Sequence, residues 1–170
     1  RIDEAAVLGD AIVEVRAGGK PGRADVADDL PLGDLASGAQ TRRELKWTMP
    51  GPMTIVDTIH DAHYRSRARL GLELARLINE EARELEALGV DVIQLDEPAF
   101  NVYMDEVREW GIGALNRAVE GLTCKTAVHI CYGYGIKANT DWKKTLGGEW
   151  RQYELTFPLL ARSRIGGVSL

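Results

Sequence analysis

The clearest indication of the fold comes from residues 89–98, which have the sequence GVDVIQLDEP. The apolar run over residues 90–95 has the length of a buried strand, and it ends in two acids and a proline. The residues before it, 65–88, place leucines at helical spacing on one stripe, and Gly89 stands where a helix C-terminal cap belongs. The segment therefore predicts a helix that passes directly into a buried strand.

The same alternation continues in both directions along the chain. Residues 44–49 are typical of a short strand, and Pro50-Gly51-Pro52 must interrupt it because proline has no N–H donor. Downstream, the pattern predicts a helix, a buried strand, a helix kinked at Pro158 and a last strand, over residues 105–121, 126–130, 149–163 and 165–170. Strands that alternate with helices predict a parallel sheet in an α/β architecture.

Two stretches are less regular. In the first 40 residues, positions 11–15 alternate like a short strand, and positions 25–38 indicate a surface excursion with one short helix. Residues 132–148 are rich in glycine and polar residues and are predicted to form a loop. We expect a single domain over residues 1–170, with an irregular excursion and hairpin over residues 1–40 and βα units over residues 41–170.

Residue types that can take part in catalysis or ligand binding stand where two predicted strands end. Active sites lie at the carboxyl ends of strands in (β/α)8 barrels and also in doubly wound sheets, so this placement does not separate the two folds. A complete barrel needs about 250 residues. If the fold is a barrel, these 170 residues hold only part of it.

The composition argues against several classes of protein. The chain has 26 acids and 21 bases, for a formal charge of −5, which disfavours a general nucleic-acid surface. No run approaches the roughly 18 apolar residues of a transmembrane helix. Two cysteines are too few for a disulfide framework, and this favours a reducing, cytoplasmic location.

His129-Ile130-Cys131 is the most informative local motif. Residues i and i+2 of a strand point to the same face, so this imidazole and this thiol are expected side by side. Zinc accepts neutral imidazole and thiolate ligands, and this pair can supply half of its tetrahedral shell. A buried histidine beside a buried cysteine is the more common explanation of such a pair taken alone.

Asp96 and Glu97 directly follow the apolar run at residues 90–95. Two carboxylates at a strand end can bind an ammonium group, act as a base or hold a metal ion. The alternative is a solvated strand-to-helix turn, in which Asp96 caps the next element and Pro98 ends the strand.

Three weaker features complete the set of candidates. A polar cluster ahead of the long helix is either a group of substrate contacts or a polar helix entrance: Asp57, His60, Asp61 and His63. Cys124 is expected at the opposite end of its strand from His129, as a core or edge thiol. Residues 133–137 lack the Gly-Lys-Ser/Thr ending of a phosphate-binding loop.

Three segments in order resemble one known family. They are KWTMPGPMT at residues 46–54, IQLDEPA at residues 93–99 and HICYG at residues 129–133. Together they are similar to the cobalamin-independent methionine synthase family, in its catalytic C-terminal barrel. Residues 132–139, YGYGIKAN, look most like the short members with a single barrel. The resemblance runs from about Thr41 to Leu170 and implies an interior piece of a partial (β/α)8 TIM-type barrel with parallel strands.

This resemblance implies zinc-dependent transfer of a methyl group to the sulfur of homocysteine, which gives methionine. In the family the His-x-Cys motif supplies two zinc ligands, which correspond here to His129 and Cys131. The aspartate of the Asp-Glu-Pro-Ala motif binds the amino group of homocysteine and corresponds to Asp96. Its neighbour Glu97 is expected to be a second substrate-binding acid.

The sequence also departs from the family pattern. The family's glutamate ligand is expected at the end of the strand at residues 168–170, so this piece alone is not expected to complete the zinc site or to be active. Thr58 stands where relatives carry a tryptophan near the folate, which argues against polyglutamyl methyltetrahydrofolate as the methyl donor. The candidate donors are methyltetrahydrofolate, another pterin and a methylcorrinoid. The alternatives are a corrinoid-dependent thiol methyltransferase, a metal-free decarboxylase of the porphyrinogen type, or an inactive α/β fragment.

Overall fold

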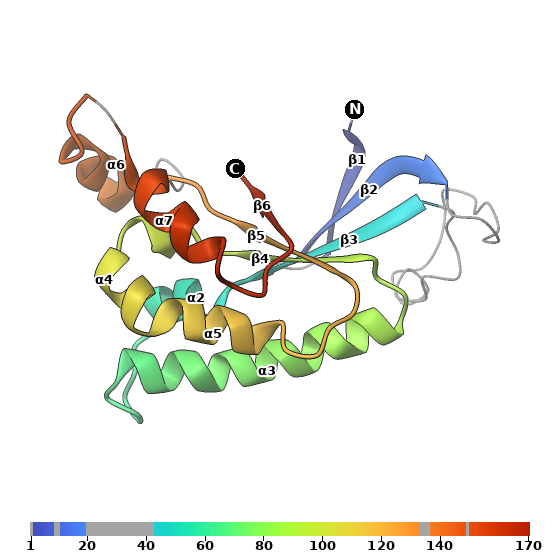
Figure 1. Ribbon diagram of the computed structural model, residues 1–170, viewed down its shortest axis with the longest axis horizontal. Helices are drawn as coiled ribbons and strands as arrows, with labels where there is room; N and C mark the ends of the chain where they lie inside the picture. Colours follow the sequence, from blue (N-terminus) through green and yellow to red (C-terminus); the bar gives the residue numbers. More distant parts are fainter. Residues whose placement is uncertain (1, 9–10, 20–42, 133–136, 149) are drawn as a thin grey trace.

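The computed structural model describes residues 2–8, 11–19, 43–132, 137–148 and 150–170. Within these residues the strands form one sheet in the order β1-β2-β3-β4-β5-β6 (Figure 1). The strands are β1 (Ile2–Leu8), β2 (Ala11–Gly19), β3 (Arg43–Pro50), β4 (Val92–Asp96), β5 (Lys125–His129) and β6 (Gly167–Ser169).

The sheet has a parallel part and an antiparallel part. Strands β3, β4, β5 and β6 pair in parallel, each with the next along the chain. This confirms the α/β architecture expected from the alternating pattern. Strands β1 and β2 form an antiparallel hairpin that adds to the free side of β3. The strand expected at residues 11–15 lies inside β2, and the excursion expected at residues 25–38 falls outside the described residues.

The helices connect the parallel strands. They are α2 (Pro52–Thr58), α3 (Arg67–Ala87), the 3-10 helix η2 (Pro98–Asn101), α4 (Met104–Glu106), the π-helix η3 (Val107–Gly111), α5 (Ile112–Ala118), α6 (Lys137–Lys144) and α7 (Gln152–Leu160). The long helix predicted at residues 65–88 is α3, two residues shorter at its start and one at its end. Ser66 caps it by accepting a hydrogen bond from the backbone of Arg69, and Gly89 follows it at a positive φ of 95°. No described helix is both long and apolar enough to cross a membrane.

Two helices occupy stretches for which the sequence pattern gave no helix. Strand β3 ends at Pro50, as expected, but Pro52 then occupies the first turn of α2, where its missing N–H costs nothing. Helix α6 lies inside the stretch predicted as a loop. Two lysines in its last turn complement the helix dipole. The segment was predicted as a loop because the stretch around it is rich in glycine.

The third difference concerns the helix predicted at residues 105–121. The structure divides this stretch into α4, η3 and α5, and it ends the helical path at Ala118. Gly121 follows with a positive φ of 72° and terminates the segment. A π-helical turn has no distinct apolar period, so the sequence predicted one continuous helix.

The helices lie against one face of the parallel strands. In Figure 1, α2, α3 and α5 lie together beneath the sheet, and α3 packs against both α2 and α5. The strand side chains that face this layer are fully buried and apolar: Ile93, Leu95, Val128 and Ile130. The opposite face carries polar residues, among them Lys46, Thr48 and Gln94. Helices on only one face of the parallel strands favour a section of a (β/α)8 barrel over a doubly wound sheet, which carries helices on both faces.

Candidate active site

The register of the sheet brings the two strongest sequence motifs to one level. Asp96, the last residue of β4, is the Cα partner of His129, the last residue of β5. His129 is in turn the partner of Ser169 on β6, and Asp96 that of Pro50 on β3. The acid of one motif and the imidazole of the other are therefore neighbours across adjacent strands at the carboxyl edge, where barrel enzymes carry their active sites.

Backbone hydrogen bonds hold this edge together beyond the last residues of the strands. The Gly51 amide donates to the Asp96 carbonyl oxygen at 2.8 Å, and the Glu97 amide donates to the His129 carbonyl oxygen at 2.7 Å. The Ile130 amide donates to the Ser169 carbonyl oxygen at 3.1 Å. Each strand end is thus tied to the next one across the sheet.

Asp96 is half-buried and borders a cavity. The side-chain amide of Gln94 donates from Nε2 to Asp96 Oδ1 at 2.8 Å. A cavity of about 300 Å³ opens beside the carboxylate, lined by Thr48, Met49, Pro50, Thr54, Ile55, Thr58 and Asp96. Apolar groups and threonine hydroxyls therefore surround one carboxylate in this cavity.

Glu97 lies in the interior and does not border this cavity. Its side chain is fully buried, and Oε1 accepts a hydrogen bond from the Met53 amide at 3.0 Å. Oε2 accepts from the Thr54 amide at 2.8 Å and from Thr54 Oγ1 at 2.7 Å. Burial raises the pKa of Glu97 to about 7, against the opposing effect of these hydrogen bonds. The carboxylate thus joins the start of α2 to the end of β4.

Gly51 is required for this contact. A Cβ atom at position 51 would overlap the carboxyl group of Glu97, so any larger residue would displace one of the two turns. The family-like segments at residues 46–54 and 93–99 therefore meet through Gly51 and Glu97. The structure places the Glu97 carboxylate between these two segments, and the expected contact of Glu97 with substrate stays a prediction.

His129 and Cys131 are both half-buried, and Ile130 between them is fully buried against the helix layer. This alternation is what two residues on one face of a strand give when the middle residue faces the core. The side chain of Asn101 donates from Nδ2 to the Cys131 carbonyl oxygen at 3.0 Å. Asn101 belongs to η2, so the segment that follows Asp96 and Glu97 also fixes the backbone of the His-x-Cys motif.

Sequence reasoning missed Gln94 and Asn101. Both are buried amides, with exposed fractions of 6% and 3%, and each holds a residue that the sequence had singled out. Gln94 carried a usable signal, because a polar residue within an apolar strand run must find a partner. Asn101 carried none, because its partner is a backbone carbonyl 30 positions away.

The donor types at the carboxyl edge suit zinc. Imidazole nitrogen and thiolate sulfur are common zinc ligands, and His129 and Cys131 supply one of each. Within the described residues, no three histidine, cysteine, aspartate or glutamate side chains are grouped so that they could hold a metal ion. This part of the chain therefore holds two side chains of the zinc-ligand type, and their assignment to a zinc ion stays a prediction.

Aromatic side chains gather beside Cys131. The ring of Tyr132 contacts those of Trp142, Trp150 and Tyr153, with centroid distances of 6.1, 4.8 and 4.9 Å. Tyr153 also donates its hydroxyl to the Ile130 carbonyl oxygen at 3.3 Å. Residues of α6 and α7 thus pack against the His-x-Cys segment.

The polar cluster ahead of α3 forms a tight turn. The Asp61 carboxylate accepts hydrogen bonds from the amides of His63, Tyr64 and Ser66 at 3.0, 2.7 and 2.9 Å. Desolvation acts to raise the pKa of Asp61, but these hydrogen bonds lower it overall. His60 and His63 are exposed and lie outside any helix, so they do not share the helical face considered from the sequence. The arrangement favours the polar helix entrance.

The two remaining candidates lie away from the carboxyl edge. Cys124 immediately precedes β5, at the end opposite His129, as the sequence predicted. Burial, followed by the nearby carboxylate of Glu86, raises its pKa to about 11. This keeps the Cys124 thiol protonated near neutral pH. Residues 133–136, considered as a phosphate loop, fall outside the described residues.

The chain is similar in sequence to proteins of one family. The family model described as cobalamin-independent synthase, catalytic domain, matches residues 33–133. The methionine synthase of Sulfurisphaera tokodaii is 38% identical over 99 residues, which make up 58% of this chain and 29% of that protein. The methionine synthase of Saccharolobus islandicus is 42% identical over 89 residues, which make up 52% of this chain and 26% of that protein. The chain thus spans less than a third of the length of these curated relatives.

A solved structure extends the similarity over most of the chain. It is a B12-independent methionine synthase from a Shewanella species, in complex with selenomethionine. It is 59% identical in sequence, with a TM-score of 0.74, and the match covers 85% of this chain and 43% of that one. The matched fold agrees with the partial TIM-type barrel described above. Because the family model also covers more than half of the residues, the chain belongs to the cobalamin-independent synthase family, as part of its catalytic domain.

Proposed function

We propose that this chain is part of the barrel of a zinc-dependent methyltransferase that converts homocysteine to methionine. One observation carries the proposal: Asp96 and His129 are partners in register at the carboxyl ends of adjacent parallel strands. This arrangement sets an acid that can bind an ammonium group beside a pair of zinc-type ligands. Homocysteine has an ammonium group and a thiol separated by a short chain, so it matches both features.

His129 and Cys131 would hold the zinc ion, with further ligands from residues beyond this chain. Zinc held there would lower the pKa of a substrate thiol, and the thiolate is the form that attacks a methyl group. In the transfer, the new S–C bond forms as the bond between the methyl carbon and its donor breaks, and the donor keeps the electron pair. Asp96 would fix the ammonium end and so orient the sulfur.

The proposal names the methyl donor by its chemical class. Thr58 borders the cavity beside Asp96 and stands where the family resemblance calls for a tryptophan near the folate. A threonine offers no flat ring for stacking against a pterin. We therefore propose that a donor other than polyglutamyl methyltetrahydrofolate, either a different pterin or a methylcorrinoid, supplies the methyl group.

Zinc analysis of cysteine and histidine variants tests the metal assignment. In the complete gene product that carries this chain, His129→Ala and Cys131→Ser should each lower the bound zinc from stoichiometric to a small fraction. Cys124→Ser is the matched control, because this thiol lies at the other end of β5 and should leave the zinc content unchanged. Full zinc occupancy in both site variants would overturn the ligand assignment.

A methyl-transfer assay with several donors tests the reaction itself. The complete gene product should form methionine from homocysteine with at least one methylated pterin or methylcorrinoid, and removal of zinc by a chelator should abolish this. A zinc-free protein that decarboxylates a porphyrinogen would instead support the second candidate reaction and overturn the first.

A further inference from the structure

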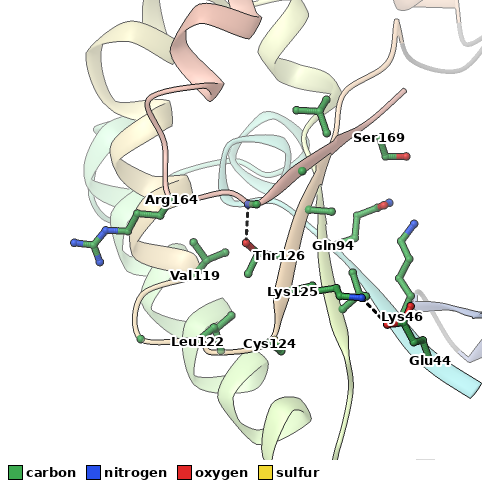
Figure 2. Close-up of a pocket in the computed structure, with 16 residues that line it drawn as sticks. Glu44, Lys46, Gln94, Val119, Leu122, Cys124, Lys125, Thr126, Arg164 and Ser169 are labelled. Atoms are coloured by element: carbon green, nitrogen blue, oxygen red, sulfur yellow. Dashed lines mark hydrogen bonds and ion pairs between the residues drawn. The ribbon is translucent and has the colours of Figure 1, made fainter. Parts of the chain in front are cut away.

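Gln94 is a buried amide on the face of the sheet opposite the helices. It lies on β4 two residues before Asp96, so both side chains point to the same face. That face is the one away from the helices, and it borders a second cavity, of about 610 Å³, on the amino-terminal half of the strands. Figure 2 shows Gln94 pointing to the same side of the sheet as Lys46 and Ser169. Gln94 is nevertheless 94% buried, with an exposed fraction of 6%.

The orientation of the Gln94 amide follows from its contact with Asp96. A carboxylate only accepts hydrogen bonds, so the Nε2 group must face Asp96 Oδ1, and the two atoms lie 2.8 Å apart. This leaves Oε1 on the other side of the amide, buried and without a hydrogen-bond partner in the part of the chain that the structure describes. An unsatisfied buried acceptor is costly, whereas a hydrogen bond to a charged group is among the stronger ones. The contact with Asp96 therefore determines the rotamer.

The row of the sheet that holds Gln94 offers few polar side-chain atoms. The Cα partners of Gln94 are Thr48 on β3 and Ala127 on β5, and Ala127 is itself paired with Gly167 on β6. The alanine and the glycine have no polar side-chain atoms with which to engage Oε1.

We propose that Gln94 is the positioning residue for recognition of the substrate's ammonium group. It fixes the Asp96 carboxylate through Oδ1 and thereby sets the direction in which this carboxylate meets the ammonium group of an α-amino thiol. Gln94 acts through Asp96 and does not itself touch the substrate. This inference rests on the proposed function, because it takes Asp96 as the group that binds homocysteine.

Gln94→Met in the complete zinc-loaded gene product tests the inference, since methionine has nearly the same shape and no donor. Homocysteine should bind roughly tenfold more weakly, as expected for loss of one hydrogen bond to a charged group. The value of kcat at saturating homocysteine, the KM for the methyl donor and the zinc content should stay near those of the unchanged protein. The binding probe for comparison is 4-mercaptobutanoate, which is homocysteine without its amino group. Both proteins should bind it equally.

A double-mutant cycle with Asp96→Asn completes the test. If Gln94 acts through Asp96, Gln94→Met should weaken homocysteine binding in the unchanged protein and have little further effect in the Asp96→Asn background. Equal weakening of homocysteine and 4-mercaptobutanoate, or additive effects in the cycle, would show a packing role and overturn the inference. Unchanged homocysteine affinity in Gln94→Met, together with a loss in Asp96→Asn, would also overturn it. Unchanged affinity in Asp96→Asn would instead contradict the assignment of Asp96 in the proposed function.

Discussion

Glu97 has no contact with solvent, and its carboxylate accepts three hydrogen bonds from the turn that begins α2. Two of the donors are backbone amides, and the third is the hydroxyl group of Thr54. The Glu97 carboxylate therefore joins two turns of the chain. By doing so it fixes the positions of its neighbours Asp96 and Gly51.

Removal of the Thr54 hydroxyl should therefore destabilise the protein. Thr54→Val keeps the shape of the side chain but deletes the donor to Glu97 Oε2, and we expect the free energy of unfolding to fall by roughly 1.5–3 kcal/mol. Thr58→Val is the matched control, because Thr58 Oγ1 donates only to the Ile55 carbonyl within the same helix and is exposed. Urea unfolding should show a change of less than about 0.5 kcal/mol for the control. Equal losses in the two variants would contradict this role of Glu97.

The same carboxylate predicts a pH dependence of stability. Burial raises the pKa of Glu97 from 4.5 to about 7 in the folded state, so between these values the folded protein binds the proton more tightly than the unfolded chain. The contribution of Glu97 to stability is therefore fully present below pH 4.5 and is lost as the pH rises through about 7. At about 1.4 kcal/mol per pKa unit, its span is roughly 3 kcal/mol.

Urea unfolding of the unchanged protein and of Glu97→Gln, from pH 4.5 to pH 8, measures this contribution. The stability of the unchanged protein relative to the variant should fall with rising pH. A difference that is constant over the range, or that grows with pH, would show that the folded-state pKa of Glu97 is not raised.

At the scale of the elements, the packing of α3 against η3 depends on a glycine. A Cβ atom at Gly71 would overlap the ring of Trp110. That ring is buried, and its Nε1 donates to Glu106 Oε2 at 3.1 Å, so it cannot easily move aside. The two helices can therefore approach closely only where α3 lacks a side chain.

Gly71→Ala should lower the free energy of unfolding by about 1–3 kcal/mol, because it overpacks this helix contact. Gly113→Ala is the matched control, since a Cβ atom there meets no atom within 4 Å and α5 gains a better helix former. The control should raise the stability by about 0.5–1 kcal/mol. Thermal unfolding followed by circular dichroism distinguishes the two. A Gly71→Ala variant as stable as the control would mean that Trp110 can be displaced at no cost.

The elements also show what the sequence could predict. Long periodic segments and apolar strand runs were found because their patterns arise from burial, which acts on every residue of the element. This is why α3 and the parallel strands lay close to the expected bounds. Helices α2 and α6 were missed because short helices depend on caps, prolines and tertiary contacts more than on period. The division of residues 104–118 by η3 depends on a local shift in hydrogen bonding that leaves no mark on the apolar pattern.

The candidate site was predictable to a similar extent. The rule that active-site residues lie at strand ends placed Asp96 and His129 at one edge, but it could not give their register, which comes from pairing between β4 and β5. The enclosed position of Glu97 was not predictable, because it depends on Gly51, a residue 46 positions earlier in the chain. The assignment of zinc to His129 and Cys131 stays a prediction.

At the scale of the whole molecule, the sheet ends at β6 with an open edge. Among the described strands, β6 pairs only with β5; its side chain Val168 is 45% exposed, and Leu170, directly after the strand, is 66% exposed. An unpaired, apolar strand edge is a template for association with another chain. The barrel of a complete relative would cover it with further strands.

We therefore expect this 170-residue chain, produced alone, to self-associate. Val168→Lys should reduce the association, because a charged side chain on an edge strand opposes strand pairing. Arg162→Lys, an exposed charge-conserving change after α7, is the control and should leave the association unchanged. Sedimentation velocity over a tenfold concentration range provides the measurement. A chain that remains monomeric throughout would show that the edge is protected.

The successive hydrogen bonds from Gly51 to Asp96, from Glu97 to His129 and from Ile130 to Ser169 have a consequence for affinity. Folding alone immobilises the backbone beneath the proposed zinc-binding and ammonium-binding groups, so most of the ordering entropy is lost before any ligand arrives. Zinc and substrate would then have only side-chain rotamers left to restrict. Binding to this edge should accordingly show a small entropic penalty in calorimetry, and a flexible peptide with the same His-x-Cys sequence should bind zinc far more weakly.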